Sequence, residues 1–129
     1  MNKIIIEVSI GELLDKISIL EIKKEKIKDP EKLKFINNEH SVLKDQLKKN
    51  VKSSDKLNNL YKSLKEINAK LWVIEDDKRQ CEKDKDFGEK FVKLSRDVHF
   101  LNDDRAKIKL EINNYTGSII KEIKEYTSY

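Results

Sequence analysis

Few residues in this chain of 129 amino acids have a type and spacing suited to chemistry, and Arg105 is the first of them. It falls within a row of apolar residues that repeats every three or four positions, so it is expected on the buried face of a helix. A buried guanidinium needs an acidic partner, because an unpaired buried charge costs several kcal/mol. We therefore expect a carboxylate beside Arg105, with Glu21 as the first candidate and Glu75 as the second.

Three further polar residues are expected close to this pair. In the register predicted for the helices, Asn68 faces Arg105, Asn102 flanks it, and His40 lies level with Glu21. Two interpretations stay open for these residues. They form either a closed network that fixes the register of the helices or an anion pocket in which Arg105 stays partly free for a carboxylate or phosphate.

Other site chemistry finds little support in the sequence. The two histidines, His40 and His99, share no helix face with a second ligand, so we expect no metal site. Glu12 and Asp15 have the spacing of a carboxylate–metal motif, but Glu12 is better explained as a helix cap and Asp15 lies off the apolar row. Cys81 is expected to be a small buried residue. No cofactor is expected, because the chain has no glycine-rich phosphate loop.

Four helices are the elements that must position these residues. Charged residues make up 40% of the chain. It has three glycines and one proline, too few for the turns that would join the strands of a β-protein. Apolar spacing and capping residues predict helices over residues 10–28, 30–50, 55–84 and 86–115. The expected N-terminal caps are Ser9, Asp29, Ser54 and Asp86, and Thr116–Gly117 is the expected C-terminal stop. The last two helices should form an antiparallel hairpin that turns near Asp86, with Leu71 near Leu101 and Leu64 near Ile108.

The two ends of the chain complete the predicted fold. Residues 3–8 alternate weakly and are expected as a short extended arm, whereas Ile119, Ile123 and Tyr126 have helical spacing and predict a last short helix. The arm and the tail should hold each other or cover the same end of the bundle. The prediction is a single all-α domain over residues 1–129, an antiparallel bundle of four main helices with an extended N-terminal arm and a docked C-terminal tail.

Charge and hydropathy restrict the partners and the compartment. Residues 22–65 hold 13 lysines and 6 acidic residues, whereas the whole chain has a net charge of +4. This excess permits weak, non-specific nucleic-acid binding, but no motif of a specific reader is present. No apolar run reaches the length of a membrane span and no signal-peptide pattern opens the chain, so we expect a cytoplasmic protein without membrane contact.

Four segments together resemble one protein family. They are IGELLDKISILEIKKEKI (Ile10–Ile27), LWVIEDDKR (Leu71–Arg79), LNDDRAKIK (Leu101–Lys109) and TGSIIKEIKEY (Thr116–Tyr126). They look like a family of short helical bacterial and phage proteins known as a domain of unknown function, and the resemblance spans nearly the whole chain. It implies a standalone bacterial or phage protein and brings no activity and no catalytic residues.

The leading functional hypothesis is a non-catalytic interaction or accessory protein. It would bind a protein partner or a second copy through long helix faces of the coiled-coil type, with Trp72 as the candidate partner contact. The first alternative is a small-anion binder or an enzyme, such as an all-helical nucleotide hydrolase, that uses the polar residues inside the bundle. The second alternative is a weak, non-specific nucleic-acid binder.

Overall fold

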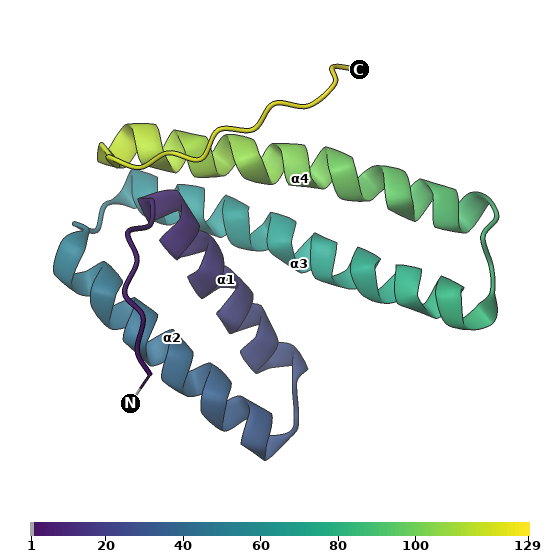
Figure 1. Cartoon of the computed structure of the whole chain (residues 1–129), viewed down its shortest axis with the longest axis horizontal. Helices are drawn as coiled ribbons and strands as arrows, with labels where there is room; N and C mark the ends of the chain where they lie inside the picture. The colour runs from purple at the N-terminus through teal and green to yellow at the C-terminus, as the bar shows by residue number, and fades with distance from the viewer. Residues whose placement is uncertain (1) are drawn as a thin grey trace.

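The computed structural model describes residues 2–129 and contains four α-helices, with no strand in that range (Figure 1). They are α1 (Ile10–Lys26), α2 (Pro30–Asn50), α3 (Asp55–Asp84) and α4 (Glu89–Thr116). The predicted all-α fold is confirmed. Asp29 and Ser54 cap α2 and α3 through their side chains, and Gly117, with a φ of 70°, ends α4 as predicted.

The turn between α3 and α4 differs from the prediction. Asp86 does not cap α4; its carboxylate accepts a hydrogen bond from the amide of Gly88 (3.1 Å), and Gly88 is the residue that precedes the helix. Lys85 ends α3 in the left-handed region, with a φ of 55°. The chain then needs the residues from Asp86 to Gly88 to reverse direction, so α4 begins at Glu89 rather than at Asp86.

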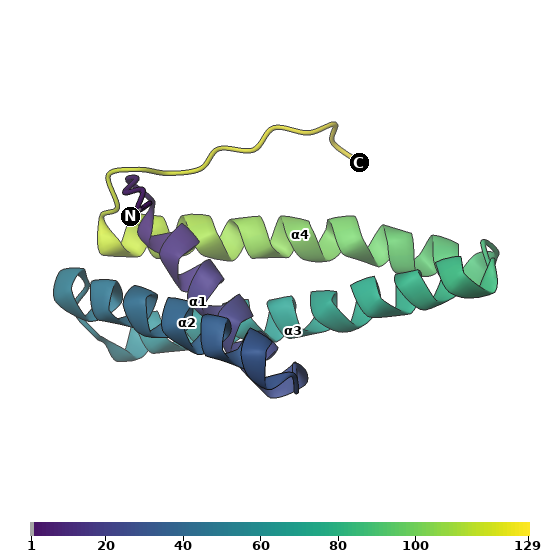
Figure 2. The same cartoon turned by 60° about the horizontal axis from the view of Figure 1, so that its bottom comes forward.

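α1 is the central helix of the molecule. α3 and α4 form the predicted antiparallel hairpin, and α1 packs against α2, α3 and α4. In the described part of the chain the α2 backbone lies close to α1 alone, and α2 has no close backbone contact with α3. Figures 1 and 2 show two hairpins that meet where α3 begins and α4 ends and that diverge from there.

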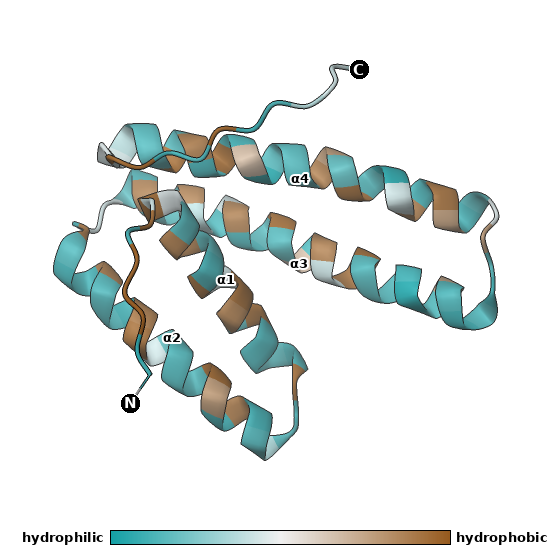
Figure 3. Cartoon of the chain, in the orientation of Figure 1, coloured by the Kyte–Doolittle hydropathy of each residue, from teal (hydrophilic) through white to brown (hydrophobic). Residues whose placement is uncertain are grey.

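The core lies at the end where the two hairpins meet. Its fully buried centre is Leu14, Leu57, Leu64 and Ile112, to which Leu47 and Ile108 add partly buried side chains. α1 also buries the side chains of Leu13, Ile17, Leu20 and Ile22. Figure 3 shows hydrophobic residues along α1 and much of α2, α3 and α4 as hydrophilic. A helix that is apolar on several sides is one that neighbours surround, which fits the central place of α1.

Gly11 sets how closely α1 approaches α4. A Cβ atom at this position would lie 2.6 Å from the carbonyl oxygen of Lys109 and 2.9 Å from Oδ1 of Asn113. Both distances are shorter than van der Waals contact, and the first atom belongs to rigid backbone. The absence of a side chain at Gly11 therefore allows the first turn of α1 to lie directly on α4.

The arm and the tail leave the molecule from the same end. There the amide of Ile10 donates a hydrogen bond to Oγ of Ser118 (3.2 Å). The tail then runs back along α4 without forming a helix, so the expected last helix is wrong (Figure 2). The isoleucines of the tail do not dock it on the bundle, since Ile119 and Ile123 are 99% and 78% exposed. The same holds for Ile4 of the arm, which is 88% exposed.

Polar side chains hold the tail in place instead. Glu122 lies 3.0 Å from the ammonium of Lys109, and the hydroxyl of Tyr129 donates to Asp103. The ring of Tyr129 also packs edge-on against Phe100. The tail docks in extended form because α4 offers it charged partners along this face rather than an apolar row.

Candidate functional site

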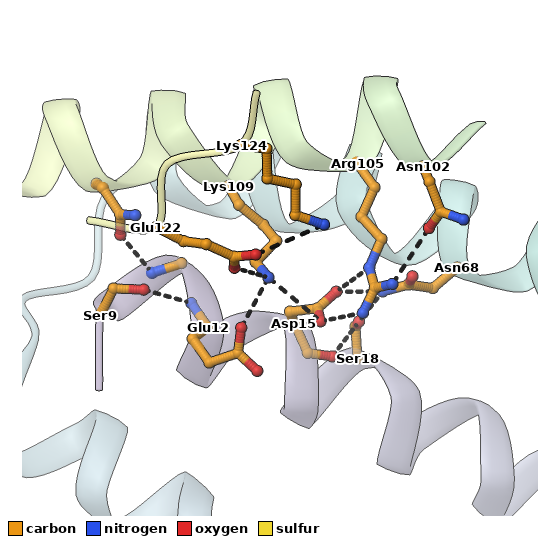
Figure 4. A network of polar contacts seen from close by, with 12 residues as sticks. Ser9, Glu12, Asp15, Ser18, Asn68, Asn102, Arg105, Lys109, Glu122 and Lys124 are labelled. Carbon is orange, nitrogen blue, oxygen red and sulfur yellow. Dashed lines mark hydrogen bonds and ion pairs between the residues drawn. The ribbon is translucent and has the colours of Figure 1, made fainter. Parts of the chain in front are cut away.

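Asp15 is the centre of a polar cluster where α1 crosses α3 and α4 (Figure 4). Its side chain is 2% exposed. Nε of Arg105 donates to Oδ1 of Asp15 (2.9 Å), and a second guanidinium nitrogen donates to Oδ2, so the pair is bidentate. Nδ2 of Asn68 donates to the same carboxylate (2.9 Å) and to Oγ of Ser18 (2.7 Å). We call these four residues the Asp15 cluster.

The partners of Asp15 hold it in its charged form. Burial raises the pKa of the Asp15 carboxyl, but the hydrogen bonds from Arg105 and Asn68 and the charges of Arg105 and Lys109 outweigh that effect. The resulting pKa of Asp15 lies below its ordinary value. The hydrogen bond to Asp15 likewise raises the pKa of Arg105, against the opposing effect of burial. Both groups are therefore charged at neutral pH.

Lys109 extends the cluster toward the tail. Its ammonium lies 2.7 Å from Glu12, 3.0 Å from Glu122 and 3.9 Å from Asp15. Burial lowers the pKa of Lys109, but the bonds to Glu12 and Glu122 raise it above its ordinary value. The Glu12 carboxylate therefore pairs with Lys109 of α4 instead of capping α1 as the sequence predicted. Ser9 does cap the helix, because its hydroxyl accepts a hydrogen bond from the Glu12 amide (3.0 Å).

Glu21 forms a second cluster one and a half turns further along α1. Nε2 of His40 lies 3.2 Å from one oxygen of the Glu21 carboxylate. The hydroxyl of Tyr61 donates to the other oxygen, and the ammonium of Lys65 lies 3.8 Å from that same oxygen. Burial raises the pKa of Glu21, but the bonds from Tyr61 and His40 and the charge of Lys65 bring it below its ordinary value. Burial and the bond to Glu21 raise the pKa of Tyr61, so its hydroxyl stays protonated.

The structure divides the predicted site residues between these two clusters. Arg105 and Asn68 meet at Asp15, and Oδ1 of Asn102 lies 3.4 Å from Arg105. Glu21 and His40 lie side by side as expected, but Glu21 is not the acid that binds Arg105. Glu75, the second candidate, is exposed on α3, and Trp72 is half-buried there.

Sequence reasoning missed Asp15 because it assumed that α1 buries one face. A helix that packs against three neighbours buries most of its circumference, so a residue off the main apolar row is also covered. The signal was present in the segment LLDKISILEI, where apolar residues occupy several sides of the helix. Asp15 and Ser18 are the small polar residues within it, and both are buried.

The N-terminus of α1 has no free amide for an anionic ligand. The amide of Gly11 donates to Oδ1 of the buried Asn113 (2.7 Å), and those of Ile10 and Glu12 donate to Ser118 and Ser9. The amide of Leu13 donates to the carbonyl of Ser9 (3.0 Å). A helix N-terminus binds anions through such amides, and side chains of this chain already occupy them.

The buried polar side chains of the described residues are also paired within the chain. Within residues 2–129, every buried side-chain nitrogen and oxygen has a hydrogen-bond partner. In the same range no three histidine, cysteine, aspartate or glutamate side chains gather as a metal site would require. None of the helices described combines the length and the apolar character needed to cross a bilayer.

Comparison with known families gives one match. The model of a family of unknown function, DUF6165, matches residues 4–129. The chain belongs to this family. No curated protein and no solved structure matches it. The DUF6165 match covers all four helices, and with them both polar clusters, but it assigns no role to their residues.

The Asp15 cluster can hold three helices in one register. Within the cluster the charges of Asp15 and Arg105 balance. Beside it, Lys109 pairs with Glu12, and Glu122 faces the Lys124 ammonium at 3.5 Å. Two guanidinium nitrogens of Arg105 donate to Asp15, and the third lies 3.4 Å from Oδ1 of Asn102. Each of the three nitrogens therefore has a hydrogen-bond partner within the chain.

Proposed function

We propose that this member of the family is a non-catalytic interaction protein of the cytoplasm, formed by one domain over residues 1–129, that associates with a second copy of itself. The outer part of the α3–α4 hairpin, residues 70–101, carries this proposal; we call it the distal hairpin. It lies beyond the crossing with α1 (Figure 1). A free, buried Cys81 suits a reducing compartment.

The distal hairpin exposes a connected apolar surface. Val73, Phe87, Val92 and Phe100 are between 40% and 54% exposed. Val73 and Phe100 line one shallow depression, and Phe87, Val92 and Phe100 line the next, so the two share Phe100. We call these four residues the distal face. Contiguous apolar patches on a small protein mark interaction sites.

The charges around the distal face favour a second copy as its partner. Lys70, Lys93 and Arg96 alternate with Glu89 and Asp97 along the two depressions. A rim of mixed sign complements itself under a two-fold axis, which is the commonest symmetry of soluble oligomers. The chain also exposes 9757 Å², whereas a compact monomer of its mass exposes about 7,100 Å².

Sedimentation equilibrium of the full-length chain tests the proposal. We expect the wild-type protein to form a dimer at a concentration of about 100 μM, a range typical of modest interfaces. The double variant V73D/F100D places two charges in the apolar centre of the interface and should be a monomer at the same concentration. Trp72, at the start of the distal hairpin, provides a fluorescence readout of the same association.

Phe35→Asp is the matched control, because Phe35 is 76% exposed on α2 and lies outside the distal hairpin. This variant should remain a dimer, with a helical circular dichroism spectrum equal to that of the wild type. A monomeric wild-type protein at every concentration, or a dimer that survives V73D/F100D, would overturn the proposal.

The alternatives have weaker structural support. A small-anion binder or hydrolase needs polar groups free for a ligand, but the Asp15 cluster is closed within the chain. A non-specific nucleic-acid binder needs a continuous basic surface with stacking groups, and the basic segment 22–65 contributes two aromatic side chains, Phe35 and Tyr61. Tyr61 donates its hydroxyl to Glu21 and is half-buried.

A further inference from the structure

A cleft of about 690 Å³ lies where α1, α2 and the start of α3 face one another. It exists because the α2 backbone approaches α1 but not α3, so the two hairpins diverge without filling the space between them. Its floor is apolar and comes from all three helices: Leu14 and Ile17 from α1, Leu47 from α2, and Leu57 and Tyr61 from α3. We call it the α2–α3 groove.

Lysines line one edge of this groove. Lys44 and Lys48 are one helical turn apart on α2, and Lys52 lies two residues beyond the end of the helix. All three are exposed, and within residues 2–129 none of them forms an ion pair of 4.0 Å or less. The one acid that lines the groove, Asp45, is bound by Lys49 at 2.9 Å. The edge therefore has an unbalanced positive charge above an apolar floor.

We propose that the α2–α3 groove binds an acidic amphipathic helix from another protein. The apolar face of that helix would lie on the half-buried side chains of Leu47, Val51 and Tyr61, and its carboxylates would meet Lys44, Lys48 and Lys52. This inference is independent of the distal face, which lies at the other end of the α3–α4 hairpin. It adds a second partner class, of different chemistry, to the proposed self-association.

The spacing of the lysines favours a helix over a ligand with one acidic group. Lys44 and Lys48 are four residues apart on α2, about 6 Å along the axis, which is also the spacing of acids at positions i and i+4 of a bound helix. The α2 residues that line the groove run from Ser41 to Lys48, about 11 Å along the axis, and can follow about two turns of such a helix. Recognition by an apolar groove with a charged rim is a recurring mode for amphipathic helices.

The groove is distinguished from the distal face by the sign of its rim. The distal face is bordered by both charges and suits a second copy of this chain, whereas the groove is bordered by lysines and suits an acidic partner. This chain has a net charge of +4 and offers no excess of acids for its own groove. The two surfaces therefore predict different partners and different salt dependence.

Fluorescence anisotropy with a designed peptide tests the proposal on the full-length chain. The probe is a labelled amphipathic helix of about five turns, with leucines along one face and glutamates beside them; its control carries lysines in place of the glutamates. We expect the glutamate peptide to bind at low ionic strength and to bind about tenfold more weakly at about 300 mM salt, because exposed charges are screened. The lysine peptide should not bind.

Two triple variants locate the site. K44E/K48E/K52E reverses the charge of the groove edge and should weaken the binding of the glutamate peptide by about tenfold or more at low salt. K32E/K34E/K62E makes the same change in net charge at exposed lysines that do not line the groove, and it should change the affinity less than threefold. Circular dichroism melts check that both variants are folded.

Four outcomes would overturn the proposal. The first is no binding of the glutamate peptide at a concentration of about 1 mM, the weakest affinity considered specific here. The second is an equal loss in both triple variants, which would show a general charge effect. The third is displacement of the peptide by laurate, which would indicate a lipid-like ligand, and the fourth is a wild-type dimer abolished by K44E/K48E/K52E, which would assign the groove to a second copy.

Discussion

At the scale of single residues, the decisive feature is a carboxylate that is buried and yet charged. Asp15 is almost inaccessible, and it is tolerated because Arg105 and Asn68 supply hydrogen bonds to both of its oxygens. Removing one partner of a buried pair costs more than removing both, because the remaining charge has no water to replace the lost contact. The pair is therefore expected to act as a unit.

We predict that Arg105→Leu lowers the free energy of unfolding by about 3 kcal/mol. Arg105→Lys should lie between the wild type and Arg105→Leu, since an ammonium keeps the charge but not the bidentate bond. The double variant R105L/D15N should regain at least half of the loss, because the buried group is then neutral. Urea unfolding at pH 7 measures all three, and additive losses in the double variant would show that the pair is not coupled.

The lowered pKa of Asp15 also makes the free energy of unfolding depend on pH, in a direction that can be predicted. The pKa of Asp15 is lowered in the folded chain, so its contribution is complete above the unfolded pKa of about 3.9 and is lost as the pH falls through the lower folded value. The difference in stability between the wild type and Asp15→Asn should therefore be constant from pH 7 to about pH 5 and shrink below about pH 4.

At the scale of elements, the tail is fixed through α1 and α4 rather than through an apolar face of its own. Ser118 receives the Ile10 amide, and Glu122 lies on Lys109, whereas Ile119 and Ile123 point to solvent. The tail thus completes the polar contacts at the start of α1. Its contribution to stability is expected to reside in these few polar residues.

Deleting residues 118–129 should lower the melting temperature by about 4–8 °C, equivalent to one or two kcal/mol in a chain of this length. Deleting residues 125–129 keeps Ser118, Glu122 and Lys124 and removes the contacts of Tyr129 with Asp103 and Phe100. It is the matched control, for which we expect a change of less than about 2 °C, because the Tyr129 contacts are exposed. Thermal melts followed by circular dichroism give the comparison. Equal melting temperatures for the longer deletion and the wild type would contradict this account of the tail.

At the scale of the whole molecule, the packing is uneven along the α3–α4 hairpin. The end that α1 crosses holds the buried residues Leu57, Leu64 and Ile112, whereas the distal hairpin has half-exposed apolar side chains and two buried residues, Leu71 and Cys81. Local stability follows the density of buried contacts. The two ends of the same helices should therefore open at different free energies.

Hydrogen exchange followed by mass spectrometry measures this gradient. Peptides that cover residues 57–68 and 105–113 should be the most protected, and peptides that cover residues 76–95 should exchange at least about tenfold faster in dilute protein. At concentrations that favour the dimer, protection should increase in residues 76–95 and not in residues 30–40. Uniform protection along α3 at low concentration would contradict the uneven packing.

The sequence by itself determined the four main helices and most of their ends, but not the start of α4 or the extended form of the tail. Apolar spacing of three and four residues, with Asp29–Pro30, Ser54 and Gly117 at helix ends, specifies local structure that depends on contacts within a few residues. It also determined that Arg105 needs a buried acid, because residue spacing places Arg105 on an apolar helix face. The contact of His40 with Glu21 was predictable because the short turn at Asp29–Pro30 sets the register of α2 against α1.

Only the tertiary structure decided which acid that is. The choice depends on α1 crossing both α3 and α4, which buries the side of α1 that carries Asp15 and directs Glu21 toward His40 and Tyr61. The divergence of α2 from α3, which opens the lysine-edged groove, was decided in the same way. Crossing angles and helix neighbours arise from side-chain packing between distant segments, and periodicity within one segment carries no information about them.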